Sequence, residues 1–290
     1  MSNTANNKNS YFKVPNQWNE INVEQLTGTI MVIGRPDSGK STMVHWLFKR
    51  LCQVHPRIGW LDGDIGQTTL GVPTTINLAL FERIRDRLPH HVASIFIGST
   101  SPRSHISPLL DGLQRLQKLA LAANTAALVV DTTGMIDQHA DGYVLKRKKI
   151  ELLQPNTVIA LQCELELEHI ITPLRMEQSC HIYVFDASEF VVRKSPEKRA
   201  RRRRNRFHRY FKSTIQHQIQ HDALPVFGPT PVNNSLMAFQ DKMGFALALG
   251  VVRSMSSETM EIMTPLSDLS HVASLRFGAL RIDPYTGEEI

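Results

Sequence analysis

Six short runs of consecutive apolar, largely β-branched residues recur along the chain, each bounded by turn-forming residues. Because the apolar residues occupy consecutive positions, these runs are typical of strands covered on both faces, as in a mostly parallel sheet. Between them lie stretches with helical apolar spacing, and this alternation predicts a doubly wound α/β domain. The expected strands are residues 29–34, 57–62, 92–98, 126–131, 157–162 and 181–186, and the expected helices are 40–52, 108–123 and 143–153.

A change in composition follows at residues 222–235, where three prolines and two asparagines predict a loop or linker. Beyond it, the alternating runs 244–252 and 275–283 indicate a small antiparallel β structure. We therefore expect one domain over residues 1–223 and a β-rich extension over residues 224–290.

The basic charge of the chain is concentrated in one segment. The formal net charge is +6, and residues 193–209 contain ten Lys or Arg and a single Glu, so the rest of the chain is slightly acidic. A polyanionic partner is therefore expected near this segment. The longest apolar stretch, 243–252, is shorter than the roughly 20 residues that span a bilayer. With three cysteines, no CxxC spacing and no apolar leader, we expect free thiols and an intracellular protein, cytoplasmic or, in a eukaryote, nuclear.

Residues 34–42 read GRPDSGKST, a complete G-x-x-x-x-G-K-[ST] motif between an expected strand and an expected helix. In this context the glycines let backbone N–H groups converge on phosphate oxygens at a helix N-terminus. Lys40 is expected to reach the β- and γ-phosphates, and Ser41 to hold Mg²⁺. The expected nucleotide-binding residues are Gly34, Asp37, Ser38, Gly39, Lys40, Ser41 and Thr42.

Three acidic residues follow strands at the edge where open α/β sheets bind ligands. Asp62 and Asp64 lie in LDGDIGQ, and Asp131 begins DTTG. One carboxylate is expected to support Mg²⁺, and the choice between Asp62 and Asp131 stays open; another would receive or orient a proton. Each of these acids alone is also ordinary turn chemistry.

The segment DTTG also has the D-x-x-G form with which GTPases sense a γ-phosphate. A GTPase or nucleotide-dependent switch is therefore the main alternative function, weakened because no N-K-x-D segment follows a plausible strand. A further alternative is a nucleic-acid-binding module without catalysis, which the intact Lys40, Ser41 and Asp64 disfavour.

If the arginine-rich segment is a helix, Arg199 and Arg203 share one face and the aromatic residues 207, 210 and 211 continue an apolar stripe. Such a helix over a nucleotide site would supply positive charge to a migrating phosphoryl group. The alternative is a solvated basic helix or tail. The segment directly follows a strand and ends in aromatic residues, which favours the first interpretation.

Together, the Walker loop, LDGDIGQ, TTGMI, GYVLKRKKIELLQPNTVIAL and the arginine-rich segment ending in YF resemble the polynucleotide 5′-hydroxyl kinase family. That family includes the RNA kinases of pre-mRNA cleavage, tRNA splicing and rRNA processing, and shorter prokaryotic relatives. The resemblance implies a P-loop kinase that transfers the γ-phosphate of ATP, or of GTP, to the 5′-hydroxyl of RNA or DNA that is single-stranded or has an exposed end. It further implies that Asp64 is the general base and that Arg199 and Arg203 belong to a lid over residues 193–221.

The sequence departs from the family pattern at Met135, where relatives have a tryptophan that would stack on the acceptor, and at Lys194, where they tend to have arginine. The separate N-terminal domain of the larger relatives is also not expected here. Two lesser features remain open. Ser101, Arg103 and His105 either face the acceptor or belong to a plain loop, and His217 and His221, four apart on an expected helix, are more typical of a surface helix than of a metal site.

Overall fold

The computed structural model describes residues 14–83, 90–137, 141–187 and 191–290. Its larger part is a seven-stranded sheet in the order β4-β3-β2-β5-β1-β6-β7. Strands β2, β5, β1, β6 and β7 run parallel, and β3 pairs antiparallel with both of its neighbours, β2 and β4. This confirms the mostly parallel α/β fold. The strands are β1 (Gly28–Gly34), β2 (Arg57–Gly63), β3 (Thr75–Glu82), β4 (His90–Phe96), β5 (Ala127–Thr132), β6 (Thr157–Gln162) and β7 (His181–Asp186).

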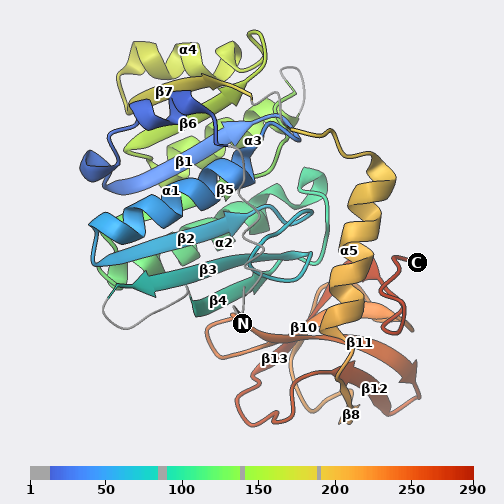
Figure 1. Ribbon diagram of the computed structural model, residues 1–290. Helices are drawn as coiled ribbons and strands as arrows, with labels where there is room; N and C mark the ends of the chain where they lie inside the picture. Colours follow the sequence, from blue (N-terminus) through green and yellow to red (C-terminus); the bar gives the residue numbers. More distant parts are fainter. Residues whose placement is uncertain (1–13, 84–89, 138–140, 188–190) are drawn as a thin grey trace, which may run out of the picture.

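Helices cover both faces of this sheet, with α1 in front in Figure 1 and α2 and α3 behind it. In β1, Ile30 and Val32 pack under α1, whereas Met31 and Ile33 pack in the cluster on the opposite face. Two covered faces explain why consecutive strand positions are apolar. The helices are α1 (Lys40–Val54), α2 (Ile106–Ala122), α3 (Asp141–Leu153), α4 (Glu168–Glu177) and α5 (Pro196–Tyr210), with 3₁₀ turns η1 (Asn16–Glu20), η2 (Val23–Gln25) and η3 (Arg103–His105).

The sequence pattern missed β3 and α4. In β3, the buried Asn77 interrupts the apolar run, and its side chain is hydrogen-bonded to Thr75 and Thr68. In α4, Pro173 lies inside the helix, where proline normally indicates an end. Both elements depend on tertiary packing more than on local preference.

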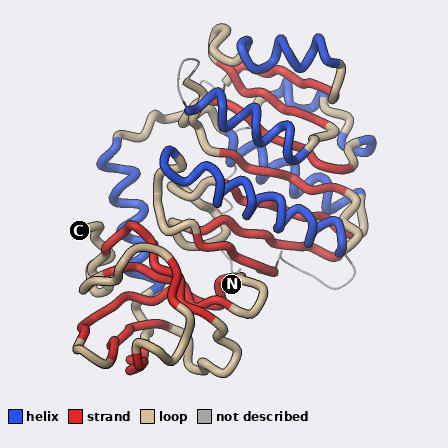
Figure 2. The backbone as a smooth tube through the Cα atoms, turned by 180° about the vertical axis from the view of Figure 1, so that it is seen from behind, coloured by secondary structure: helices blue, strands red, loops and turns tan. Residues whose placement is uncertain are grey.

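The C-terminal residues form a second sheet in the order β8-β12-β11-β10-β13-β9, which lies beside β4 (Figures 1 and 2). The two sheets approach closely at Gly98 and Gly278, where a Cβ on Gly98 would lie 2.5 Å from the Cα of Gly278. Its strand pairs are antiparallel except for β13 with β9, which confirms the expected small, mainly antiparallel β extension. Its strands are β8 (Ile215–Gln220), β9 (Val226–Phe227), β10 (Ser235–Gln240), β11 (Ala246–Met255), β12 (Thr259–Thr264) and β13 (Ser274–Arg281).

The helix expected around His217 and His221 is wrong, because residues 215–220 form strand β8, which pairs with β12. Nε2 of His217 lies 2.8 Å from the carbonyl oxygen of Leu266, and Nε2 of His221 lies 3.0 Å from that of Ser256. The helix of the arginine-rich segment therefore ends at Tyr210, short of the expected bound at 221, and the C-terminal sheet begins before residue 224.

The arginine-rich segment is a helix, α5, as expected. Ser195 caps it by accepting a hydrogen bond from the backbone N–H of Lys198, and Pro196 occupies the first turn. Phe207 is fully buried and packs with Phe211 and Ile282 in a cluster shared with the C-terminal sheet. The aromatic face thus anchors α5 while the helix stands beside the carboxyl ends of the parallel strands (Figure 1).

Candidate active site at the P-loop

The phosphate-binding motif forms the turn between β1 and α1. Gly39 precedes the helix with φ of +95°, a conformation that favours glycine, and Lys40 is the first helical residue. The N-terminal N–H groups of α1 therefore open into a cavity of about 480 Å³. Six of the seven expected nucleotide-binding residues line this cavity: Asp37, Ser38, Gly39, Lys40, Ser41 and Thr42.

Lys40 is buried against its own loop, and its Nζ donates a hydrogen bond of 2.6 Å to the carbonyl oxygen of Arg35. Burial lowers the pKa of Lys40, while the carboxylates of Asp131 and Asp64 act in the opposite direction. The ammonium group is thus held at the loop in which a phosphate chain would lie.

Ser41 and Asp131 meet beside this loop. The hydroxyl of Ser41 donates a hydrogen bond of 2.9 Å to Oδ2 of Asp131, which lies near the carboxyl end of β5. Burial raises the pKa of Asp131 to about 7, and the neighbouring carboxylates of Asp62 and Asp64 add to the rise. A hydroxyl and a carboxylate at this distance are oxygen ligands of the kind that Mg²⁺ takes.

Asp62 on β2 is the register partner of Asp131 on β5, but its carboxylate has different hydrogen-bonding partners. It is fully buried, and its Oδ2 accepts hydrogen bonds from the hydroxyl of Thr68 at 2.7 Å and from the backbone N–H groups of Thr69 and Leu70. Its carboxylate therefore organises the loop after β2, and Asp62 does not line the cavity among the described residues.

Asp64 lines the same cavity as the P-loop residues. Its Oδ1 accepts hydrogen bonds of 3.0 Å from the backbone N–H groups of Gly66 and Gln67. Oδ2 of Asp64 accepts no hydrogen bond from the residues that the structure describes. The turn thus fixes the carboxylate and leaves one oxygen available to the cavity.

The two arginines expected in a lid, Arg199 and Arg203, are held by two different carboxylates. Arg199 donates a hydrogen bond of 2.5 Å to Asp37 of the P-loop, which also accepts one from the backbone N–H of Lys194. Burial by itself raises the pKa of Asp37, but these hydrogen bonds outweigh it and the pKa lies below its usual value. Arg203 forms an ion pair with Glu289 of the C-terminal segment while still lining the cavity.

Several wall residues were not predicted, among them Gln67, Thr100 and Arg202. Of the loop after β4, Thr100 and Pro102 line this cavity, whereas Arg103 lines an adjoining one of about 610 Å³ together with Arg35 and Arg193. Met135 lines both cavities.

The fully buried Lys146 was also missed. Its Nζ donates hydrogen bonds to the hydroxyl of Thr132, at 2.9 Å, and to the carbonyl oxygen of Thr133. It therefore fixes the segment that follows Asp131. The available signal was its spacing in the expected helix 143–153, four residues before Ile150 and seven before Leu153, which places a lysine on an apolar face.

Among the described helices, none is long and apolar enough to cross a membrane. The chain is similar in sequence to several known proteins. A polyribonucleotide 5′-hydroxyl-kinase of Methanocaldococcus jannaschii is 26% identical over 327 residues, covering 90% of this chain and 88% of that protein. One of Pyrococcus abyssi is 27% identical and covers 90% and 89%.

The fold is similar to that of Clp1p in the solved structure of the wild-type Clp1p–Pcf11p complex. The TM-score is 0.69 at 12% sequence identity, and the match covers 88% of this chain and 74% of that one. The family model described as mRNA cleavage and polyadenylation factor CLP1 P-loop matches residues 34–213, more than half of the chain. These findings confirm the resemblance inferred from the sequence motifs, and the chain belongs to the CLP1 P-loop family.

Proposed function

We propose that this protein is a polynucleotide 5′-hydroxyl kinase that transfers the γ-phosphoryl group of ATP to the 5′ end of RNA or DNA. The observation that carries the proposal is the single cavity of about 480 Å³ that gathers Lys40, Ser41, Asp64 and Arg199. Relatives that cover nine-tenths of the chain are named polyribonucleotide 5′-hydroxyl-kinases, which supports an RNA acceptor.

Nucleotide binding follows from the P-loop. The backbone N–H groups at the start of α1 would hold the phosphates, and Lys40 would neutralise charge on the β- and γ-phosphates. Ser41 and Asp131 would hold Mg²⁺, which supplies further neutralisation of phosphate charge when bound. Asp62 is the weaker candidate for this role, because its carboxylate is already occupied by the loop after β2.

Asp64 would act on the acceptor. As the 5′-hydroxyl oxygen bonds to the γ-phosphorus, the bond from that phosphorus to the β–γ bridging oxygen breaks and ADP leaves. The hydroxyl proton passes to the free oxygen of Asp64. Two hydrogen bonds to the other oxygen fix the carboxylate in one orientation, which a general base requires.

Arg199 and Arg203 would stabilise the charge of the transferred group. Arg199 already joins the lid to the P-loop through Asp37, so that a phosphate arriving in the loop would lie within reach of its guanidinium. Arginines in this position are worth orders of magnitude in the rate of phosphoryl transfer.

The test is transfer of label from γ-labelled ATP to matched RNA and DNA oligonucleotides that carry a 5′-hydroxyl. Asp64→Asn, which keeps the shape of the side chain, should leave nucleotide affinity nearly unchanged and lower turnover by about 10²- to 10⁴-fold. Lys40→Ala is the control that should lose label through loss of nucleotide binding.

Equal loss of nucleotide affinity and turnover in Asp64→Asn would exclude the role as general base. Phosphate release without an acceptor, and with a strong preference for GTP, would instead favour a nucleotide-dependent switch that uses the segment after β5.

A further inference from the structure

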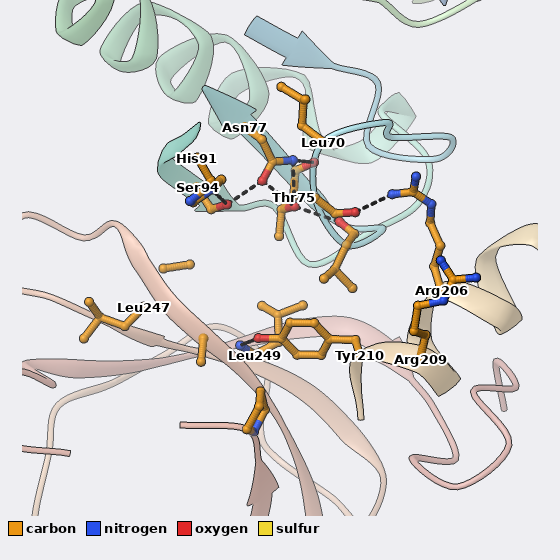
Figure 3. Close-up of a pocket in the computed structure, with 15 residues that line it drawn as sticks. Leu70, Thr75, Asn77, His91, Ser94, Arg206, Arg209, Tyr210, Leu247 and Leu249 are labelled. Atoms are coloured by element: carbon orange, nitrogen blue, oxygen red, sulfur yellow. Dashed lines mark hydrogen bonds between the residues drawn. The ribbon is translucent and has the colours of Figure 1, made fainter. Parts of the chain in front are cut away.

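A second cavity, of about 620 Å³, lies where the P-loop domain, the end of α5 and the C-terminal sheet meet (Figure 3). Its walls come from the loop before β3, from β3 and β4, from β11 and from the last turns of α5. A volume of this size is typical of a site for a small molecule or for one unit of a polymer. The proposed transfer reaction takes place in the nucleotide cavity and does not use this one.

The second cavity shares two walls with the nucleotide site. Asp64 and Gln67 line the nucleotide cavity, and Leu70 and Gly71 of the same loop line the second one. The other common wall is α5. The nucleotide cavity is lined by its residues Arg199, Arg202 and Arg203, and the second cavity by Arg206 and Arg209. At 3.6 residues per turn, these five side chains fall within about 120° of the helix circumference and extend over about 15 Å.

Three of the five arginines have partners. Arg199 and Arg203 form the ion pairs described above, and Arg206 donates hydrogen bonds to the carbonyl oxygens of Gly71, at 2.6 Å, and Thr69, at 3.1 Å. For Arg202 and Arg209, the described residues provide no carboxylate or hydrogen-bonding partner. These two free cations lie two turns apart on one face, one at each cavity.

The interior of the second cavity is suited to binding a nucleobase with little preference for which base it is. Ser94, Asn77 and Thr75 hydrogen-bond to one another on one side, so their polar atoms are largely satisfied. Figure 3 shows the ring of Tyr210 on the opposite side, where its hydroxyl accepts a hydrogen bond from the backbone N–H of Leu249. The described lining includes no Asp or Glu. A fixed aromatic ring next to an unpaired arginine is typical of sites that bind single-stranded nucleic acid with little sequence preference.

We propose that the acceptor strand continues from its 5′ end along the arginine face of α5 and places a downstream nucleotide in this second cavity. Arg202 and Arg209 would contact its phosphates, and Tyr210 would pack against a base. This inference rests on the proposed kinase function and narrows the acceptor to an oligonucleotide several units long.

The test compares a dinucleotide with an octanucleotide, both RNA with a 5′-hydroxyl, as acceptors of the full-length protein. The wild type should have a higher kcat/KM for the octanucleotide. Arg209→Ala should lower this value about tenfold for the octanucleotide and far less for the dinucleotide. It should also reduce the slope of log affinity against log salt by about 0.7, the change expected for one lost phosphate contact on a single strand.

Arg201→Ala is the matched control, since Arg201 is exposed on α5 but lines neither cavity. Arg201→Ala should leave kcat/KM unchanged for both acceptors. Arg209→Lys, which keeps the positive charge, should retain part of the preference for the octanucleotide over the dinucleotide. Direct binding of a 5′-phosphorylated octanucleotide, measured by fluorescence anisotropy, reports on the second cavity without any transfer.

An equal effect of Arg209→Ala on both acceptors, or no effect on either the rate or octanucleotide binding, would overturn the proposal. If the wild type phosphorylates neither acceptor, the kinase function fails. In that case, octanucleotide binding that is weakened by Arg209→Ala would still support the proposed path of the strand along α5. Octanucleotide binding that Arg209→Ala leaves unchanged would overturn the proposed path as well.

Discussion

Lys149 is a fully buried lysine in α3, and its Nζ has no hydrogen-bonding partner among the described residues. Burial lowers its pKa from the usual 10.5 to about 8, even though the carboxylates of Asp64 and Asp131 act in the opposite direction. Lysine is rarely buried without a partner, because the charged form loses its hydration. Lys149 should therefore reduce the stability of the folded protein at neutral pH.

The magnitude follows from the shift in pKa. At roughly 1.36 kcal/mol per pKa unit, lowering the pKa of Lys149 from 10.5 to about 8 corresponds to about 3 kcal/mol. Because the folded-state pKa is the lower one, the unfolded chain binds more protons between about pH 8 and 10.5. The cost is therefore complete below pH 8 and disappears as the pH rises towards 10.5.

Lys149→Met keeps a long side chain and removes the charge. At neutral pH we expect it to raise the free energy of unfolding by about 3 kcal/mol, measured by urea denaturation. The gain should shrink markedly at about pH 9.5, where wild-type Lys149 is largely neutral in the folded state. Lys148→Met, at the exposed neighbouring position, should change stability by less than about 0.5 kcal/mol.

A less stable Lys149→Met protein at neutral pH would refute this reasoning, because it would mean that the ammonium group is compensated by its surroundings. A gain that does not change with pH would show that shape, rather than charge, is responsible.

Two further substitutions test the geometry of the site and of the lid. A Cβ at Gly134 would lie 2.5 Å from the backbone nitrogen of Pro36, so Gly134→Ala should displace the P-loop. We expect nucleotide affinity to fall at least about tenfold in a fluorescent-nucleotide titration. Unchanged affinity would contradict the close contact. Phe207→Ala should lower the free energy of unfolding by about 3–5 kcal/mol, because the ring is fully buried between α5 and the C-terminal sheet. Phe227→Ala, at an exposed position, should cost far less, and equal losses would exclude the anchoring role.

The sequence was most informative where a function needs local structure. The motif at residues 34–42 requires a strand before it and a helix after it, and both could be recognised from nearby residues. That Ser41 lies close to a carboxylate also follows from local features, since Ser41 begins a helix and the candidate acids end strands at the same sheet edge.

The choice between the two acids of this edge could not be made in the same way. Asp62 and Asp131 are register partners on adjacent strands, and both end apolar runs. Their roles differ because the hydroxyl of Thr68 and the backbone of residues 69 and 70 fold back onto Asp62. Only the conformation of that loop, which carries little sequence pattern, decides which carboxylate reaches Ser41.

In the arginine-rich segment, too, the sequence does not predict the tertiary contacts of individual residues. In sequence it is a low-complexity basic run, but on the helix its members have separate tasks. Arg199 binds the P-loop through Asp37, whereas Arg204 forms an ion pair with Glu288, 84 residues further along the chain. Helical periodicity alone predicts which residues share a face; it does not predict what each face meets.

The anchoring of α5 explains how so many like charges are kept together beside one site. Phe207 and Phe211 fix the C-terminal end of the helix to the C-terminal sheet, so the position of the arginine face does not depend on a bound phosphate. Like charges on adjacent turns repel, and the acids of the P-loop and the C-terminal segment offset only part of this repulsion. The remaining positive charge at Arg202 and Arg209 is therefore held by the fold in advance, and a phosphate chain bound there as proposed would gain electrostatic energy without a cost for ordering the helix.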